Sequence, residues 1–174
     1  MAEGSSCGQA RTLAAVHLRR PPLVWAGYAA FAWGLVFGGI SFYWALGGIL
    51  GSDTVGSSVE QMATANGHAA LWITGFMKVL GAVLALALVQ PWGWRLPRPL
   101  LLVLGWGAAA VLTLYGGVNV AGEALTASGL IRPGTVDWKS LLWHLYVWDM
   151  SFLVWGVLFG LAAWYHTWAT SRSW

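Results

Sequence analysis

The stretch LLWHLYVWDMSFLVWGVLFGLAAW, residues 141–164, decides the fold of this chain. It is long enough to cross a bilayer as one α-helix, which takes about 20 residues. It nevertheless contains one carboxylate, Asp149, about 12 Å from its outer end at about 1.5 Å per residue. A charge near the centre of a spanning helix costs on the order of 3 kcal/mol on insertion scales. We therefore expect Asp149 either to act in a function or to pair with another buried group.

The rest of the chain is equally apolar. Of its 174 residues, 58% are hydrophobic and only 9% are charged, whereas about a quarter of the residues of soluble domains are charged. The composition therefore predicts an integral membrane protein. The formal net charge of +3 is small, so nucleic acid is not an expected partner. The single cysteine, Cys7, cannot form an internal disulfide.

Four apolar segments predict an all-α fold: a four-helix transmembrane bundle, antiparallel, forming one domain over residues 1–174. The expected spans are residues 23–50, 68–89, 100–122 and 141–164. Arginines gather before the first span, between the second and third, and in the tail. The positive-inside rule therefore places both termini in the cytoplasm.

Small residues predict which helix faces pack. Gly156 and Gly160 lie on roughly the same helical face as Asp149, and G-x-x-x-G pairs mark close helix approach. Asp149 is therefore expected to face the interior. Lys78 shares its face with Gly75 and other small residues, so it too is expected to point inward.

The antiparallel arrangement brings polar side chains from different spans into the outer half of the membrane. Those at membrane depth are Lys78, Asn119, Glu123 and Asp149, and those at the mouth are Glu60, His68 and His144. The cytoplasmic half carries no such group. The pattern therefore predicts a cavity open to the outer face or the outer leaflet rather than a continuous pore.

Carboxyl groups beside many aromatic rings indicate a reaction that starts by protonation and passes through a cation. A protonated Asp149 or Glu60 is a candidate general acid, and aromatic faces, above all those of tryptophan, attract cations. The combination suits the cyclisation of a carbocation. The residues expected to bind the substrate and set the electrostatics of its cavity are Tyr43, Trp44, Trp72, Lys78, Tyr115, Asn119, Glu123, Trp143, His144, Tyr146 and Trp148.

Two other interpretations stay open. Lys78 and Asp149 lie at matching depth, so they can form a buried structural salt bridge. His68 and His144 come from different spans at similar depth, so a haem held by two histidines is geometrically possible. The sequence has no glycine-rich phosphate loop and no cluster of cysteine and histidine, so no metal and no cofactor is predicted.

The run Phe42-Tyr43-Trp44-Ala45-Leu46-Gly47-Gly48, together with Trp148-Asp149, resembles a family of small actinobacterial four-helix membrane proteins of unknown function. In size, topology and residue character the chain is also similar to the compact bacterial membrane-bound terpene cyclases of drimentine-type pathways. Fungal membrane cyclases of meroterpenoid pathways use acidic residues for protonation. These resemblances imply a bacterial plasma-membrane location, with Glu60 and Asp149 as the acidic pair.

Residues and resemblance together lead to one hypothesis and one alternative. The hypothesis is a membrane-bound terpene cyclase that starts by protonation and cyclises a lipophilic prenylated substrate, such as a farnesylated indole diketopiperazine. The alternative is a non-enzymatic membrane protein that binds a lipid or a hydrophobic small molecule, or that is a subunit of a membrane complex.

Overall fold

The computed structural model describes residues 23–55, 67–131 and 134–171, and within these ranges the fold is helical without strands. Its elements are α2 (Val24–Ala45), η1 (Ser52–Thr54), α4 (Gly67–Ala87), η2 (Gly93–Arg95), α5 (Arg98–Ala127), α6 (Trp138–Trp143), η3 (His144–Trp148) and α7 (Asp149–Ser171). The segments α6, η3 and α7 follow each other without a break and form one rod. Within the residues that the structure describes, four helices are long and apolar enough to cross a membrane, which confirms the predicted all-α, four-helix fold.

The predicted span limits need three corrections. The first helix ends at Ala45 instead of residue 50, because Gly47 and Gly51 take positive φ values of 91° and 77° that end a helix. The third helix continues to Ala127, so Asn119 and Glu123 both lie inside it. The last span begins at Trp138, where the Asp137 side chain accepts hydrogen bonds from the amides of Lys139 and Ser140 and so caps the helix.

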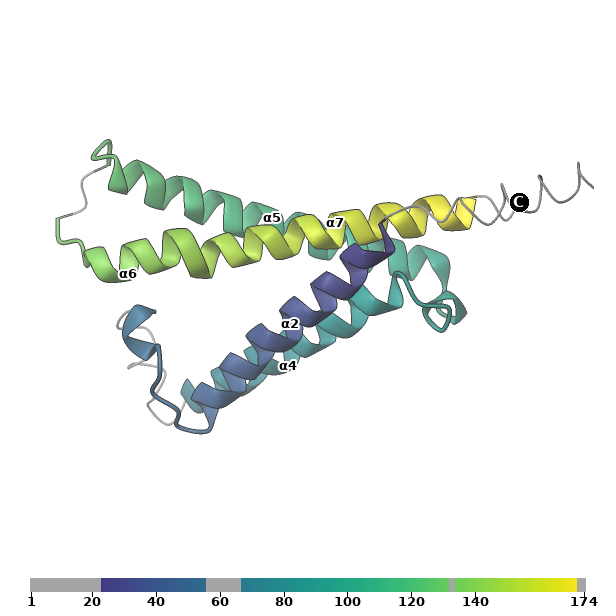
Figure 1. Cartoon of the computed structure of the whole chain (residues 1–174), viewed down its shortest axis with the longest axis horizontal. Helices are drawn as coiled ribbons and strands as arrows, with labels where there is room; N and C mark the ends of the chain where they lie inside the picture. Colours follow the sequence, from purple (N-terminus) through teal and green to yellow (C-terminus); the bar gives the residue numbers. More distant parts are fainter. Residues whose placement is uncertain (1–22, 56–66, 132–133, 172–174) are drawn as a thin grey trace, which may run out of the picture.

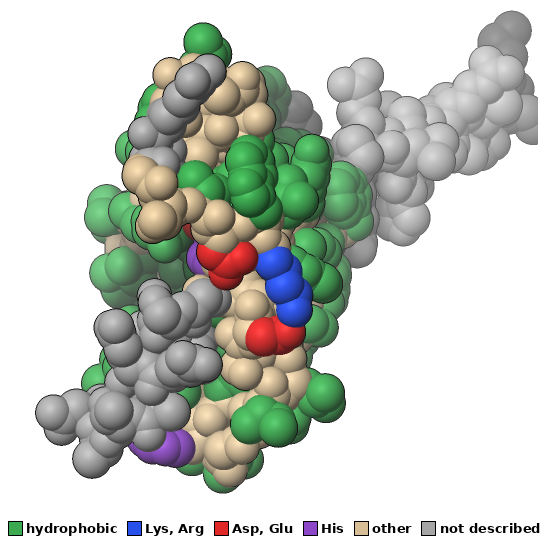
Figure 2. Space-filling view, turned by 90° about the vertical axis from the view of Figure 1, so that its left-hand side faces the viewer, with side chains coloured by type: hydrophobic (Ala, Val, Ile, Leu, Met, Phe, Trp, Pro, Cys, Tyr) green, Lys and Arg blue, Asp and Glu red, His purple; other side chains and the backbone are tan. Residues whose placement is uncertain are grey.

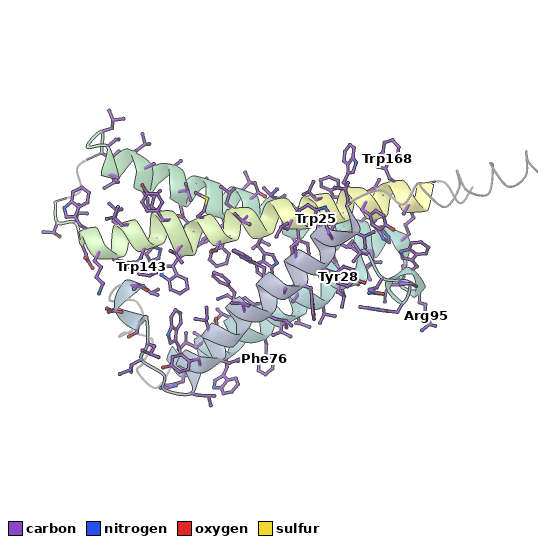
Figure 3. All side chains as sticks on the ribbon, viewed as in Figure 1. Trp25, Tyr28, Phe76, Arg95, Trp143 and Trp168 are labelled. Carbon is purple, nitrogen blue, oxygen red and sulfur yellow. The ribbon has the colours of Figure 1, made fainter. Side chains whose placement is uncertain are left out.

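The four long helices form two antiparallel hairpins, α2 with α4 and α5 with α7 (Figure 1). The hairpins meet at the end that carries η2, here called the closed end, and diverge towards the end that carries η1 and α6, here called the open end. Arg95, Trp25 and Trp168 lie at the closed end (Figure 3), as does the last described residue of α7. By the positive-inside rule this is the end that we expect in the cytoplasm.

Small residues explain the tight first hairpin. A Cβ atom added to Gly34 would lie 2.9 Å from the Ala82 side chain, and one added to Gly38 would lie 3.1 Å from that of Val79. The predicted face of small residues on the first span therefore packs against α4, as expected for close helix approach in membranes.

Trp155 of α7 joins the two hairpins. Its side chain is 4% exposed, packs against Gly34 and Gly81, and donates from Nε1 to the carbonyl oxygen of Ala30 at 2.9 Å. Phe159 continues this core one turn further. The contact with Ala30 crosses from α7 to α2, so Trp155 fixes how the hairpins meet.

The second hairpin packs through backbone contact. A Cβ atom added to Gly116 would lie 2.5 Å from the amide nitrogen of Leu153 and 2.8 Å from the carbonyl oxygen of Asp149. Gly156 packs equally closely on Thr113 of α5. The predicted inward face of Gly156 and Asp149 is thereby confirmed.

Large apolar side chains cover the outside of the bundle, as a lipid-facing surface requires. Exposed examples from three helices are Val36, Ile73, Val103, Val111, Leu114 and Val118. Figure 2 looks onto the open end, where acidic and basic side chains gather between these hydrophobic surfaces.

Lys139 and Asp53 form an ion pair at this end and so join α6 to η1. The hydrogen bond from Lys139 holds the pKa of Asp53 below its usual value of 3.8. A lowered folded-state pKa adds stability above the unfolded pKa, and that contribution disappears as the pH falls through the folded value. We expect Lys139→Met to return the pKa of Asp53 towards 3.8, as measured by carboxyl NMR titration. An unchanged pKa would show that the pair is not formed.

Candidate functional site

A π-helical turn lies in the last span, directly before its carboxylate residue Asp149. Residues His144–Trp148 have the wider winding of a π-helix, between α6 and α7. In a regular α-helix, residues five apart lie about 140° apart around the axis. The wider turn instead brings His144 onto Asp149, with 2.7 Å between Nδ1 and Oδ2. Such π-helical turns are frequent at functional sites.

Asp149 is held from two sides. Besides its contact with His144, its Oδ1 accepts a hydrogen bond of 3.2 Å from the Asn119 amide on α5. The residue is 4% exposed. The predicted convergence of Asn119 and Asp149 is therefore confirmed, and His144 belongs to the same cluster rather than to a mouth above it.

Both ring nitrogens of His144 face oxygen atoms. Nδ1 faces Asp149, and Nε2 lies 3.4 Å from the carbonyl oxygen of Val55, which follows η1 on the other hairpin. An imidazolium ring would donate from both nitrogens, whereas a neutral ring that donates to Val55 would leave Nδ1 as an electron-pair donor. The ring thus connects the two hairpins and has its Nδ1 within the cluster.

Glu123 completes the group. Its Oε1 lies 3.8 Å from Nδ1 of His144, and its Oε2 is fully buried without a hydrogen-bond partner among the described residues. A buried polar atom without a partner costs about 1–3 kcal/mol. Glu123, His144 and Asp149 each place one donor atom within 4.8 Å of the others, which is close enough to surround one cation. We call these three residues the acid–histidine cluster.

Lys78 does not belong to this cluster. Its ammonium donates to the Ser41 hydroxyl at 2.8 Å and lies 5.6 Å from the centre of the Phe37 ring and 5.9 Å from that of Phe152. Lys78 is therefore inward-facing, as expected, but the salt bridge with Asp149 that depth alone suggests is not among the ion pairs of the described residues. Depth along a helix does not determine direction around it, and Lys78 faces its own hairpin partner.

An apolar cavity of about 590 Å³ lies at the open end between η1 and the last span. Four of the predicted substrate-binding residues line it, namely Tyr43, Trp44, Trp143 and Trp148. Figure 3 shows Trp143 at this end. The remaining walls are Val36, Gly39, Ile40, Leu50, Gly51, Thr54 and Val147. We call this cavity the aromatic groove.

Hydrogen bonds hold the aromatic groove in shape. The indole of Trp148 donates to the Thr54 hydroxyl at 3.2 Å, and that of Trp44 donates to the carbonyl oxygen of Leu50 at 2.9 Å. The Tyr43 hydroxyl accepts from the Leu50 amide at 3.3 Å. The polar atoms of these rings are thus used by the loop after α2, so the groove presents mainly their apolar faces.

A second cavity, of about 320 Å³, borders the acid–histidine cluster. Its wall includes Glu123 and His144, with the polar residues Thr126, Thr135, Asp137 and Ser140 around them. Asp149 lines neither cavity. The groups of the cluster that a molecule in this cavity would meet are therefore Glu123 and His144.

Other predicted residues lie elsewhere. Trp72 stacks with Phe76 on the surface of α4, the exposed Tyr115 packs edge-on against Phe152, and Tyr146 is 69% exposed. None of these three lines either of the two cavities. Glu60 lies outside the described residues.

Two parts of the site were not predicted from the sequence: the loop residues Thr54 and Val55, and the π-helical turn. Thr54 and Val55 contact Trp148 and His144 from the other hairpin, although the connector they belong to looks like an ordinary polar loop. The π-helical turn has no sequence signal of its own, because HLYVW reads as part of one apolar helix. The one sequence feature that fits such a turn is the spacing of five between His144 and Asp149, since a regular α-helix would point these side chains about 140° apart.

Comparison with protein-family profiles identifies the family of this chain. The profile of a family described as "Protein of unknown function (DUF3995)" matches residues 34–159, well over half of the chain. The chain belongs to the DUF3995 family. The DUF3995 match includes the groove residues from Val36 onward and the whole acid–histidine cluster. It agrees with the expected resemblance to a four-helix membrane family of unknown function. No curated protein and no solved structure matches the chain.

Proposed function

We propose that this DUF3995 protein binds a lipophilic small molecule in the aromatic groove, at the membrane depth of the open end. The observation that carries the proposal is the cavity of about 590 Å³ with aromatic walls. Ligand sites typically measure about 300–1,000 Å³ and are lined mostly by hydrophobic and aromatic side chains. In an outer membrane leaflet such a site takes its ligand directly from the bilayer.

The chemistry of the walls supports an uncharged ligand portion. No charged side chain lines the groove, and the indole nitrogens of Trp44 and Trp148 already donate to protein oxygens. A charged headgroup placed there would lose its hydration without gaining a partner. An isoprenoid or acyl chain would fill the groove by apolar contact alone.

Filling the groove tests this proposal. Gly39 lines the groove, and a Cβ atom added there meets nothing within 4 Å. Gly39→Phe is expected to reduce photo-crosslinking of a diazirine-bearing farnesyl probe at least about tenfold, since the new ring occupies the ligand's volume. Gly107→Phe is the matched control, because Gly107 on α5 is equally uncrowded and does not line the groove. Equal labelling of both variants would contradict the proposal.

A second candidate function is the membrane-bound terpene cyclase. It is favoured by the acid–histidine cluster lying at the same end as the aromatic groove, on another face of the same helix. In this reaction a protonated carboxyl group would add a proton to an alkene or epoxide of a prenylated substrate, and the faces of Trp143 and Trp148 would stabilise the cation. The carboxylate left by the first step would then take a proton from the substrate cation, which ends the cyclisation and restores the acid. Glu123 lines the second cavity and is the candidate acid that a substrate would meet, whereas Asp149, the first candidate from the sequence, is buried and lines neither cavity.

Incubation of membranes with a farnesylated indole diketopiperazine separates the two candidates. The cyclase should form a cyclised isomer of unchanged mass, and Asp149→Asn and Glu123→Gln should each abolish it. A wild-type protein that binds the farnesyl probe but forms no isomer would reject the cyclase and leave the binding function. Full activity of both variants would remove these carboxyl groups from the reaction.

A further inference from the structure

We propose that the acid–histidine cluster is a binding site for one first-row divalent transition-metal ion, such as Zn²⁺ or Mn²⁺, held by Glu123, His144 and Asp149. The proposal goes beyond ligand binding in the aromatic groove and does not depend on it. One imidazole nitrogen and two carboxylate oxygens form a donor set that these ions accept.

The distances fit a shared ion. Ligand atoms about 2.0–2.2 Å from one metal ion lie about 3–4 Å from each other. The Glu123 oxygen is 3.8 Å from Nδ1 of His144, and the Asp149 oxygen is 2.7 Å from the same nitrogen. The second separation would need to widen, by roughly half an ångström or more on this geometry. The ligand atoms of all three residues lie within 4.8 Å of one another, so side-chain adjustments of this size are enough to bring them around one ion.

Neighbouring groups orient the ligands in the way that metal sites require. A metal-bound histidine usually donates its other ring N–H to a carboxylate or a backbone carbonyl. Nε2 of His144 faces the Val55 carbonyl oxygen at 3.4 Å. A neutral ring that donates there would offer the electron pair of Nδ1 to a metal ion, which would replace the present contact of Nδ1 with Asp149. Asn119 donates to Oδ1 of Asp149 at 3.2 Å and so directs Oδ2 towards the cluster.

The charges support the same conclusion. The cluster gathers two carboxyl groups beside one imidazole, and one carboxylate oxygen, Oε2 of Glu123, is buried without a hydrogen-bond partner among the residues that the structure describes. Buried charges in proteins are usually paired or bound to metal ions. A divalent cation with a neutral His144 would balance both carboxylates.

The cavity of about 320 Å³ beside the cluster provides access. Glu123 and His144 form part of its wall, so an ion bound by the three side chains would keep at least one coordination position for water or another small ligand. A site with three protein ligands and an open position resembles catalytic rather than structural metal sites.

Metal binding to the purified protein tests the inference. The full chain in detergent micelles, treated with a chelator and desalted, would be titrated with ZnCl₂ or MnCl₂. Binding would be followed by isothermal calorimetry, and bound metal counted by elemental mass spectrometry. We expect one ion per chain, with affinity at least about tenfold weaker in His144→Gln and Glu123→Gln. Asp53→Asn, an exposed acid at the same end outside the cluster, should bind as the wild type does.

The metal-binding experiment and the photo-crosslinking experiment can fail independently of each other. No retained metal in the wild type, or equal affinity in Glu123→Gln and Asp53→Asn, would overturn the metal site. Glu123→Gln keeps the test valid if His144→Gln fails to fold, because glutamine has nearly the same volume as glutamate and keeps a side-chain oxygen. Labelling by the farnesyl probe reports on the groove in the same samples. A bound cation would also occupy the carboxyl groups that the cyclase needs protonated, so metal content also bears on that candidate.

Discussion

Replacement of Asp149 by leucine is expected to destabilise the folded protein by about 3 kcal/mol, because two polar groups would lose the partner that they share, at about 1–3 kcal/mol each. Leucine fills a similar volume but accepts no hydrogen bond. The Asn119 amide and Nδ1 of His144 would both lose the oxygen atoms they now face. Since Asp149 is 4% exposed, water has little access to replace those contacts.

Asp149→Asn is the matched variant and is expected to cost less than about 1 kcal/mol. Asparagine keeps an oxygen for Asn119, and its amide can donate to Nδ1 of a neutral His144, whose Nε2 then donates to Val55. The free energy of unfolding in mixed micelles with increasing SDS would measure both variants. Equal destabilisation of both would show that the negative charge itself, rather than the hydrogen bonds, holds this part of the fold.

Lys78→Met provides a further control on this interpretation. Lys78 donates to Ser41, so its removal is not expected to rescue Asp149→Leu. Rescue would mean that the two charges pair after all, because removing the second partner would then relieve an unpaired buried charge.

Replacement of Gly156 by leucine is expected to disrupt the second hairpin. Even one added Cβ atom would lie 2.6 Å from the backbone nitrogen of Thr113, so α5 and α7 would have to separate. Overpacking of a well-packed interior typically costs about 1–3 kcal/mol, and a leucine against backbone should reach or exceed the upper limit. Gly156→Ala should fall within that range.

Gly107→Leu on α5 is the control for this second prediction. A Cβ atom at Gly107 has no neighbour within 4 Å, so the same change in size and helix propensity occurs there without a clash. Thermal unfolding in detergent, followed by size-exclusion chromatography, would show a lower midpoint for Gly156→Leu only. A similar decrease in both would indicate that packing on Thr113 is not the cause.

The helices and their packed faces were predictable because both follow from local rules. Apolar length predicts a span, and the spacing of Gly34, Gly38 and Gly156 indicates the close-packed faces that the structure confirms. The spacing around Gly156 also placed Asp149 towards the interior, and the antiparallel arrangement of the spans brought it together with Asn119.

The details of the site were less predictable, because they depend on contacts between distant segments. Nothing near Val55 in the sequence indicates that its carbonyl oxygen meets His144, and the π-helical turn that directs His144 arises within an apparently regular helix. The predicted pairing of Lys78 with Asp149 was wrong, because similar depth along two helices does not determine the direction in which each side chain points around its helix. Aromatic residue type alone likewise did not separate the groove-lining Trp143 from the surface residue Trp72.

The pairing of helices into two hairpins has a consequence for membrane insertion and folding during translation. Each hairpin buries its own small-residue face between helices that are consecutive in the membrane, so α2 and α4 can associate before α5 leaves the ribosome. The later hairpin then adds Trp155 to an already formed pair. Biogenesis can thus proceed as two successive insertions, and a chain divided in the η2 connector should still reassemble from its two halves.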